Sequence, residues 1–330
     1  MSEAQQSRIE QYLLYHRTSA TAGDIDPSYA MLRYVCDRYE LNTEQRYWLA
    51  WLYSMFYCGA SAFYVYNEFP DYENVDVARM SRWWHEQGGR DKVLAQTDRR
   101  WVRSSHQFVP AFESYREWLR GKTQADHFQW FTDTWASPEQ RYDMLLESAS
   151  GLYSFGQFAL FLYLEALHTV TPIDLMPTDL DLNKAWSCRN GLYYAYGRDD
   201  LVDDTATPIR PGSVLETAEM WSSLRLELSR LENPPTVWQT ETLLCAFRKW
   251  MRGKRYIGFY LDRQATEIAK LQDRVREGVY WDVLWQYRRE TYDPQWLAEA
   301  DGHVDARGLS REWREFVTSR TRRIMEGDRG

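Results

Sequence analysis

Helical periodicity is the feature of this sequence that most limits the folds open to it. Apolar and aromatic residues recur at helical spacing through most of the chain, whereas the alternating pattern of a half-buried strand is scarce. No turn of the Asn-Gly type joins two alternating runs, so no β-hairpin is predicted. We therefore predict an all-α, multi-helix globular fold.

Capping residues, glycines and prolines divide this pattern into separate predicted helices. Asn42 or Thr43 is a plausible N-cap for a long segment that runs to Tyr66, either as one helix or as two that break near Cys58. The other predicted helices cover residues 75–87, 108–119, 137–148, 156–168, 213–231, 241–250, 264–277 and 310–326.

The length of 330 residues allows one large domain or two smaller ones, and 44% hydrophobic residues can build a substantial core. We predict a single helical domain over residues 1–330; if it has two lobes, they divide within residues 120–150. Residues 319–330, which contain four arginines, are predicted to be a flexible, solvated tail.

The formal net charge of −8 means that bulk electrostatics do not drive this chain onto nucleic acid, and such binding needs a local basic face. The 16 Trp and 23 Tyr residues are an unusually large number. Most of these rings are expected to build the core, and a minority are expected to line a cleft.

The N-terminal sequence and the spacing of the cysteines predict the cellular compartment and whether the chain binds a metal. The sequence lacks a leader-like start and a run of about 18 uncharged apolar residues, so we expect a cytoplasmic protein without a membrane span. The four cysteines are far apart and show no metal-ligand spacing, and we interpret them as free thiols without a metal or disulfide role: Cys36, Cys58, Cys188 and Cys245.

Two segments combine clustered cations with aromatic rings and a carboxylate. They are Gln96–Arg103 and Arg252–Arg263. Arginine presents a planar fork of donors that matches phosphate oxygens, and an aromatic face can stack on a base taken out of its helix. This combination suits an anionic group next to a flat base.

A glycine-rich turn lies in Ala149–Ala159, and an aspartate follows one helix later in Thr171–Leu175. The arrangement loosely resembles the helix–hairpin–helix element of DNA glycosylases, in which exposed amides at a helix N-terminus grip a backbone phosphate. An ordinary turn between packed helices is an equally good interpretation.

Several polar groups have the chemistry of a site. Asp174, Asp179 and Asp181 lie within eight residues and could hold a divalent ion, cap helices or deprotonate an amine. Arg189 and Asn190 suit a carboxylate or the edge of a base.

A tyrosine stripe at residues 53, 57, 64 and 66 precedes Asn67. Such a stripe is more often core than binding pocket, but Asn67 ends the segment where a cleft residue would lie. The sequence has no Walker A, GxGxxG, GxSxG or HExxH motif, which lowers support for ATP hydrolysis, dinucleotide binding and serine hydrolysis.

Taken in order, several of these segments resemble the bacteriophage amino acid:DNA transferases, also called alpha-glutamyl/putrescinyl thymine pyrophosphorylases. The resemblance covers roughly residues 40 to 270. Its segments are Arg46–Tyr53, Asn67–Asp71, Thr97–Arg100, Ser187–Gly191 and Gly253–Arg263.

The resemblance implies a helical enzyme with a glycosylase-like core, acting in the cytoplasm of an infected bacterial host. Its partners would be double-stranded phage DNA carrying 5-(pyrophosphooxymethyl)uracil and a small amine donor. The amine of an amino acid or polyamine would displace pyrophosphate at the exocyclic methylene, giving a hypermodified thymine. No cofactor is expected, although a divalent metal remains possible.

Under this hypothesis each candidate residue has a role. The pyrophosphate and the DNA backbone would contact Arg99, Arg100, Arg103, Lys254, Arg255 and Arg263. A flipped base would lie against Tyr57, Tyr64 and Asn67, and the amine donor against Arg189 and Asn190. The base that takes the amine proton would be one of Asp98, Asp179 and Asp262, each of which could instead orient a nearby arginine.

Two other functions remain open. One is another base-modifying enzyme, such as a DNA glycosylase or a hydroxymethyluracil kinase, although no phosphate loop supports a kinase. The other is a non-catalytic DNA-binding phage protein, against which the acidic net charge argues mildly. Glycine, glutamate and putrescine are all possible donors.

Overall fold

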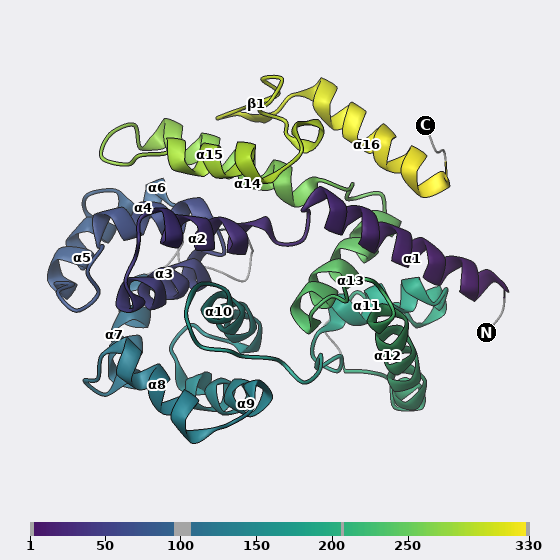
Figure 1. Ribbon diagram of the computed structural model, residues 1–330, viewed down its shortest axis with the longest axis horizontal. Helices are drawn as coiled ribbons and strands as arrows, with labels where there is room; N and C mark the ends of the chain where they lie inside the picture. The colour runs from purple at the N-terminus through teal and green to yellow at the C-terminus, as the bar shows by residue number, and fades with distance from the viewer. Residues whose placement is uncertain (1–2, 96–106, 206–207, 328–330) are drawn as a thin grey trace. The chain divides into compact units, whose positions relative to one another are not determined.

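The computed structural model describes residues 3–95, 107–205 and 208–327, and the regular secondary structure of these residues is almost entirely helical (Figure 1). The all-α prediction is confirmed. The first helices are α1 Glu3–Ala22, α2 Pro27–Arg38, α3 Thr43–Phe56, α4 Gly59–Glu68, α5 Val77–His85, α6 Gly89–Lys92, α7 Phe108–Leu119 and α8 Gln124–Thr134. The later ones are α9 Pro138–Ser148, α10 Gln157–Val170, α11 Trp186–Ala195, α12 Val214–Ser229, α13 Val237–Met251, α14 Phe259–Arg274, α15 Asp282–Thr291 and α16 Arg311–Glu326.

The remaining regular structure is short. A two-stranded antiparallel hairpin pairs β1 Val304–Asp305 with β2 Gly308–Leu309. Single 3₁₀ turns are η2 Ala149–Gly151, η3 Asp199–Leu201, η4 Pro211–Ser213 and η5 Pro294–Trp296. None of the described helices is long and apolar enough to cross a membrane.

The chain forms two compact units, each built from separated segments. Unit 1 comprises residues 1–26, 178–262 and 310–330, and unit 2 comprises residues 27–177 and 263–309. This division differs from the predicted boundary within residues 120–150. Helices α7 to α9 stay in unit 2 because α8 packs on both α3 and α9.

Unit 2 is built around α3, whose residues 47–56 are all buried. Asn42 starts this helix with a capping box, and Tyr57 ends it in the left-handed conformation. The next helix begins at Gly59, so both the predicted N-cap and the predicted break are confirmed. Trp48 and Trp51 are fully buried and stack at 5.1 Å, as expected for a core built from large rings.

Unit 1 contains α1, α11, α12, α13 and α16. Its closest helix pair is α11 with α13, and α12 packs beside α11 (Figure 1). Helix α16 continues to Glu326 because it buries one residue at each turn, at positions 313, 317, 321 and 325. Residues 319–326 of the predicted tail are therefore helical.

Two buried histidines make the protein sensitive to acid. His16 in unit 1 and His127 in unit 2 are 3% and 9% exposed, and burial lowers the pKa of each from 6.5 to about 4. At these two sites the unfolded chain binds more protons than the folded chain between these values, so their contribution to stability falls as the pH drops from about 6.5 toward 4. Each site contributes on the order of 3 kcal/mol across this window.

The measurement is the urea midpoint at pH 7 and at pH 4.5. We expect His16→Phe to flatten the pH dependence, because both ring nitrogens of His16 are buried without a hydrogen-bond partner among the described residues. His303→Gln, at a residue that is not buried, serves as the control and should keep the wild-type profile. Identical slopes for wild type and His16→Phe would contradict this account.

Candidate functional site

The loop that joins α13 to α14 turns sharply at Gly253. Gly253 has φ +66°, and the amides of Gly253 and Lys254 donate to the carbonyls of Trp250 and Lys249. This is a Schellman ending, which favours glycine at its left-handed position. The turn leaves Lys254 exposed, whereas the next residue, Arg255, is buried.

Arg255 is a buried cation with unused hydrogen-bond donors. Its guanidinium lies 4.4 Å from the ring centre of Phe259 and 4.2 Å from that of Tyr260, and the residue is only 8% exposed. Its Nε and Nη1 atoms have no hydrogen-bond partner among the described residues. Burial lowers the pKa of Arg255, but Tyr260 raises it more, so the side chain stays charged. A buried, charged fork of this kind has two donor atoms that an anion could accept from.

Arg255 faces a cavity of about 780 Å³ within unit 1, a volume suited to a small ligand. Its charged lining consists of three arginines and one carboxylate: Arg8, Arg255, Arg322 and Glu326. The rest of the wall comes from α1, the end of α13 and α16: Ser7, Gln11, Trp250, Met251, Gly253, Thr318, Thr321 and Met325. This excess of positive charge favours an anionic ligand.

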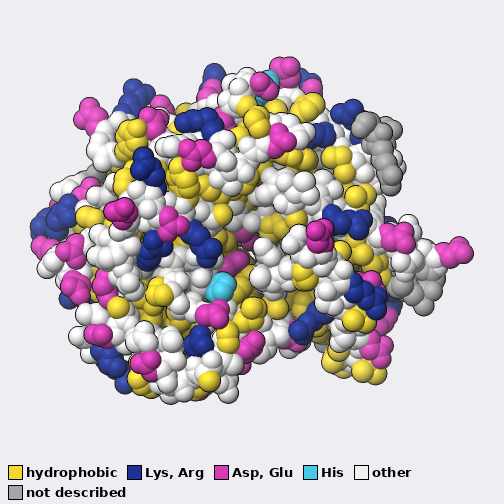
Figure 2. Space-filling view, viewed as in Figure 1, with side chains coloured by type: hydrophobic (Ala, Val, Ile, Leu, Met, Phe, Trp, Pro, Cys, Tyr) yellow, Lys and Arg dark blue, Asp and Glu magenta, His cyan; other side chains and the backbone are white. Residues whose placement is uncertain are grey.

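The positive charge of this cavity is local. On the face shown in Figure 2, Lys and Arg side chains are interspersed with Asp and Glu. Together with the acidic net charge, this means that an anionic ligand would need a local group of cations such as these arginines.

Asp24 and Asp262 hold the Arg255 loop in place. Asp24 accepts hydrogen bonds from the amides of Gly258 and Tyr260, both at 2.7 Å, and of Leu261 at 3.2 Å. Burial raises the pKa of Asp24 to about 7, although these three donors and the charge of Arg255 oppose the shift.

Asp262 accepts from the Tyr256 hydroxyl at 2.7 Å and from Trp313 Nε1 at 2.9 Å, which ties the loop to α16. The backbone adds a further tie, because the amide of Ile257 donates to Thr321 Oγ1 at 3.0 Å. These bonds fix the backbone on both sides of Arg255. The guanidinium is therefore held in one position before any ligand arrives, which reduces the ordering cost of binding.

The sequence model of the amino acid:DNA transferase family matches residues 20–256 of this chain. The chain belongs to the amino acid:DNA transferase family. A serinyltransferase of Salmonella phage ViI is 31% identical over 166 residues, which is 48% of this chain and 39% of that protein. The match thus spans about two fifths of the relative's length. No solved structure matches the chain significantly, and the resemblance to helix–hairpin–helix glycosylases stays a prediction.

The family match includes Arg255 and the wall that ends α13, but it does not reach Arg322. Arg8 and Arg322 were not predicted as site residues. Neither lies in a motif, and Arg322 falls in the segment interpreted as a tail. The structure brings them to the cavity because α1 and α16 both line it.

Among the candidate bases, Asp262 is 1% exposed and engaged by Tyr256 and Trp313, which suits an orienting residue better than a proton acceptor. Asp179 is exposed, and its Oδ1 accepts from Trp221 Nε1 and from the Leu180 amide. Asp98 lies outside the described residues, as do Arg99, Arg100 and Arg103.

The residues predicted to bind the amine donor make local contacts in unit 1. Arg189 is 2% exposed, and its Nη1 donates to the carbonyls of Leu182 and Asn183 at 3.1 Å each. Asn190 is fully buried and pairs at both ends of its amide with the backbone of Asp203. These bonds hold the segments that flank α11.

The remaining predicted residues belong to unit 2. Tyr57 packs edge-on against Tyr53, and Tyr64 lies 5.8 Å from the ring of Trp83. Asn67 is exposed and donates to the Phe63 carbonyl, and Arg263 donates to Glu267 Oε1 at 3.2 Å. Both tyrosines are less than 10% exposed, so the base-pocket role stays a prediction.

Proposed function

We propose that this protein transfers an amino acid to a modified base in phage DNA, by displacing pyrophosphate from 5-(pyrophosphooxymethyl)uracil. Membership of the amino acid:DNA transferase family supports the reaction class. The observation that carries the substrate assignment is Arg255, a buried cation whose Nε and Nη1 lack partners at an arginine-lined cavity. The name of the phage relative makes serine the first donor to test.

The reaction balances as a substitution at the exocyclic methylene carbon. The amine nitrogen forms a bond to this carbon, the carbon–oxygen bond to pyrophosphate breaks, and pyrophosphate leaves with the electron pair. The ammonium product then loses one proton to a base. Negative charge builds on the leaving oxygen in the transition state, where a fixed guanidinium stabilises it most.

In this proposal Arg255 binds the pyrophosphate, and Arg8 and Arg322 add charge to the same cavity. Lys254 is exposed beside it and contacts the DNA backbone. Asp179 is the better proton acceptor of the two described candidates, because Asp262 is buried and engaged. Arg189 and Asn190 hydrogen-bond to the backbone before and after α11, and their direct contact with the amine donor stays a prediction.

The test uses DNA that carries 5-(pyrophosphooxymethyl)uracil. The DNA is incubated with the protein and with serine, glycine, glutamate or putrescine in separate reactions, and its nucleosides are then analysed by mass. We expect one new nucleoside, the uracil methylene joined to one donor, together with one pyrophosphate released per product.

Other outcomes identify the other functions. Release of a free base would indicate a glycosylase. Unchanged DNA with every donor, combined with salt-dependent binding, would indicate a DNA-binding protein without this activity. Either result would contradict the proposal.

A further inference from the structure

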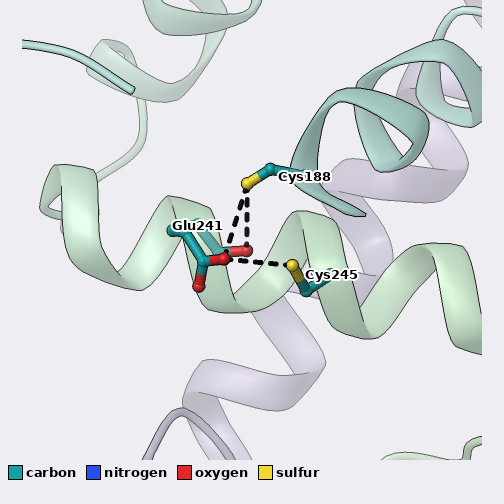
Figure 3. A group of neighbouring side chains, drawn as sticks. All are labelled: Cys188, Glu241 and Cys245. Atoms are coloured by element: carbon teal, nitrogen blue, oxygen red, sulfur yellow. Dashed lines mark hydrogen bonds between the residues drawn. The ribbon is translucent and has the colours of Figure 1, made fainter. Parts of the chain in front are cut away.

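Three potential metal ligands meet between α11 and α13, outside the arginine cavity. Cys188 lies on α11, and Glu241 and Cys245 lie one turn apart on α13 (Figure 3). Their side chains point toward one another. Among the residues that the structure describes, no other group of three His, Cys, Asp or Glu side chains is close enough to share an ion.

The distances fit three corners of a tetrahedron. Glu241 Oε1 lies 3.1 Å from Cys245 Sγ and 3.6 Å from Cys188 Sγ, and all three ligand atoms lie within 4.8 Å of one another. Zinc bonds of about 2.3 Å to sulfur and about 2.0 Å to oxygen place tetrahedral ligand atoms about 3.5 to 3.8 Å apart. Small shifts of these side chains would therefore complete the coordination geometry.

The chemistry of the ligands favours zinc among common divalent ions. Two thiolates are soft ligands that magnesium and calcium do not select, whereas zinc accepts sulfur and carboxylate oxygen together. Cys188 is fully buried and Cys245 and Glu241 are half-buried, so the group is sheltered yet reachable by an ion.

Tyr12 provides a second, independent observation. Its hydroxyl is fully buried on α1 and has no hydrogen-bond partner in the described part of the chain. Helix α1 packs against both α11 and α13, and the Tyr12 ring lies edge-on, 5.2 Å from the ring of Phe247 on α13. A buried hydroxyl without a partner is costly, and a water held in this region would give it one.

We propose that Cys188, Glu241 and Cys245 bind one zinc ion, which clamps α11 to α13. The fourth position is left for a water. Both cysteines lose their protons on binding, and the ion balances the charge of the two thiolates. The site does not depend on the proposed reaction, and its function is to stabilise unit 1.

The first test is the zinc content of the full-length protein. The protein is loaded with zinc sulfate, passed over a chelating resin, and measured by elemental mass spectrometry. We expect about one zinc per chain, a loss to background in Cys188→Ser/Cys245→Ser, and no loss in Cys36→Ser, a buried thiol of unit 2. Chelation with a strong ligand should lower the melting temperature, and added zinc should restore it.

A second measurement on the wild-type chain keeps the test valid if the double variant fails to fold. Cobalt(II) added to the metal-free protein should give the charge-transfer absorption of thiolate ligands and the visible bands of a tetrahedral site, both removed by one equivalent of zinc. Zinc at background in the loaded wild type, or no thiolate–cobalt absorption, would overturn the proposal. A disulfide between Cys188 and Cys245, detected by mass after alkylation, would also overturn it.

Discussion

Replacing Arg255 by methionine should lower the transfer rate by about 100- to 1000-fold, the usual loss when a fixed donor to a developing anion is removed. Arg255 is the natural position for this test because its guanidinium is 8% exposed, lies between two rings, and keeps two donor atoms without a partner among the described residues. The readout is initial rate with DNA containing 5-(pyrophosphooxymethyl)uracil.

The same substitution should leave the fold intact. Methionine is close to arginine in length and packs well against aromatic rings, and it removes a buried charge whose donors are incompletely satisfied. The melting temperature of Arg255→Met should therefore stay close to that of the wild type. Arg255→Lys keeps the charge but not the planar fork, so its rate should fall between the two.

Arg311→Met is the matched control, because it removes one arginine of unit 1 from an exposed position on α16. Its rate should stay within about twofold of wild type, as expected for an exposed residue outside the cavity. Near-normal turnover of Arg255→Met would mean that the pyrophosphate does not bind in this cavity. Equal losses in Arg255→Met and Arg311→Met would mean that overall charge matters and not the cavity.

Local sequence signals predicted much of the fold. The capping residue Asn42, the break before Gly59 and the apolar run of α10 are each encoded within a few neighbouring residues, and the structure has all three features. Helices α1, α2, α6, α8, α11 and α15 were not predicted. Helix α1 shows why, because its apolar and polar residues have almost no one-sided arrangement along Glu3–Ala22.

The site was predictable only where its residues are neighbours in the chain. Arg255 stands in a visible cluster of cations and rings, so the sequence indicated it. Arg8 and Arg322 reach the same cavity from opposite ends of the chain, and no spacing rule connects them. The proximity of Cys188 and Cys245 was not predicted for the same reason: the two cysteines lie on different helices, and the third residue of the group is a glutamate. The sequence predicted free thiols from their spacing and an expected reducing cytoplasm, and all four cysteines are free in the structure.

Gly191→Ala should destabilise unit 1 by about 3 kcal/mol or more, the upper range for overpacking a core. Gly191 lies in the middle of α11, where helix propensity alone would favour alanine by about 1 kcal/mol. A steric clash outweighs this preference for alanine. A Cβ at this position would lie 2.1 Å from the Leu244 carbonyl oxygen and 2.6 Å from its carbonyl carbon. Both atoms are backbone of α13, so they cannot rotate away as a side chain can.

The two helices would have to separate, and α13 carries the Trp250 and Met251 wall of the arginine cavity. We expect the melting temperature of Gly191→Ala to fall by roughly 10 °C, with a loss of soluble protein. Gly212→Ala is the matched control in unit 1, since nothing lies within 4 Å of its added Cβ and its φ is not positive. An unchanged or raised melting temperature for Gly191→Ala would mean that propensity outweighs the contact, and that α11 and α13 do not approach as closely as described.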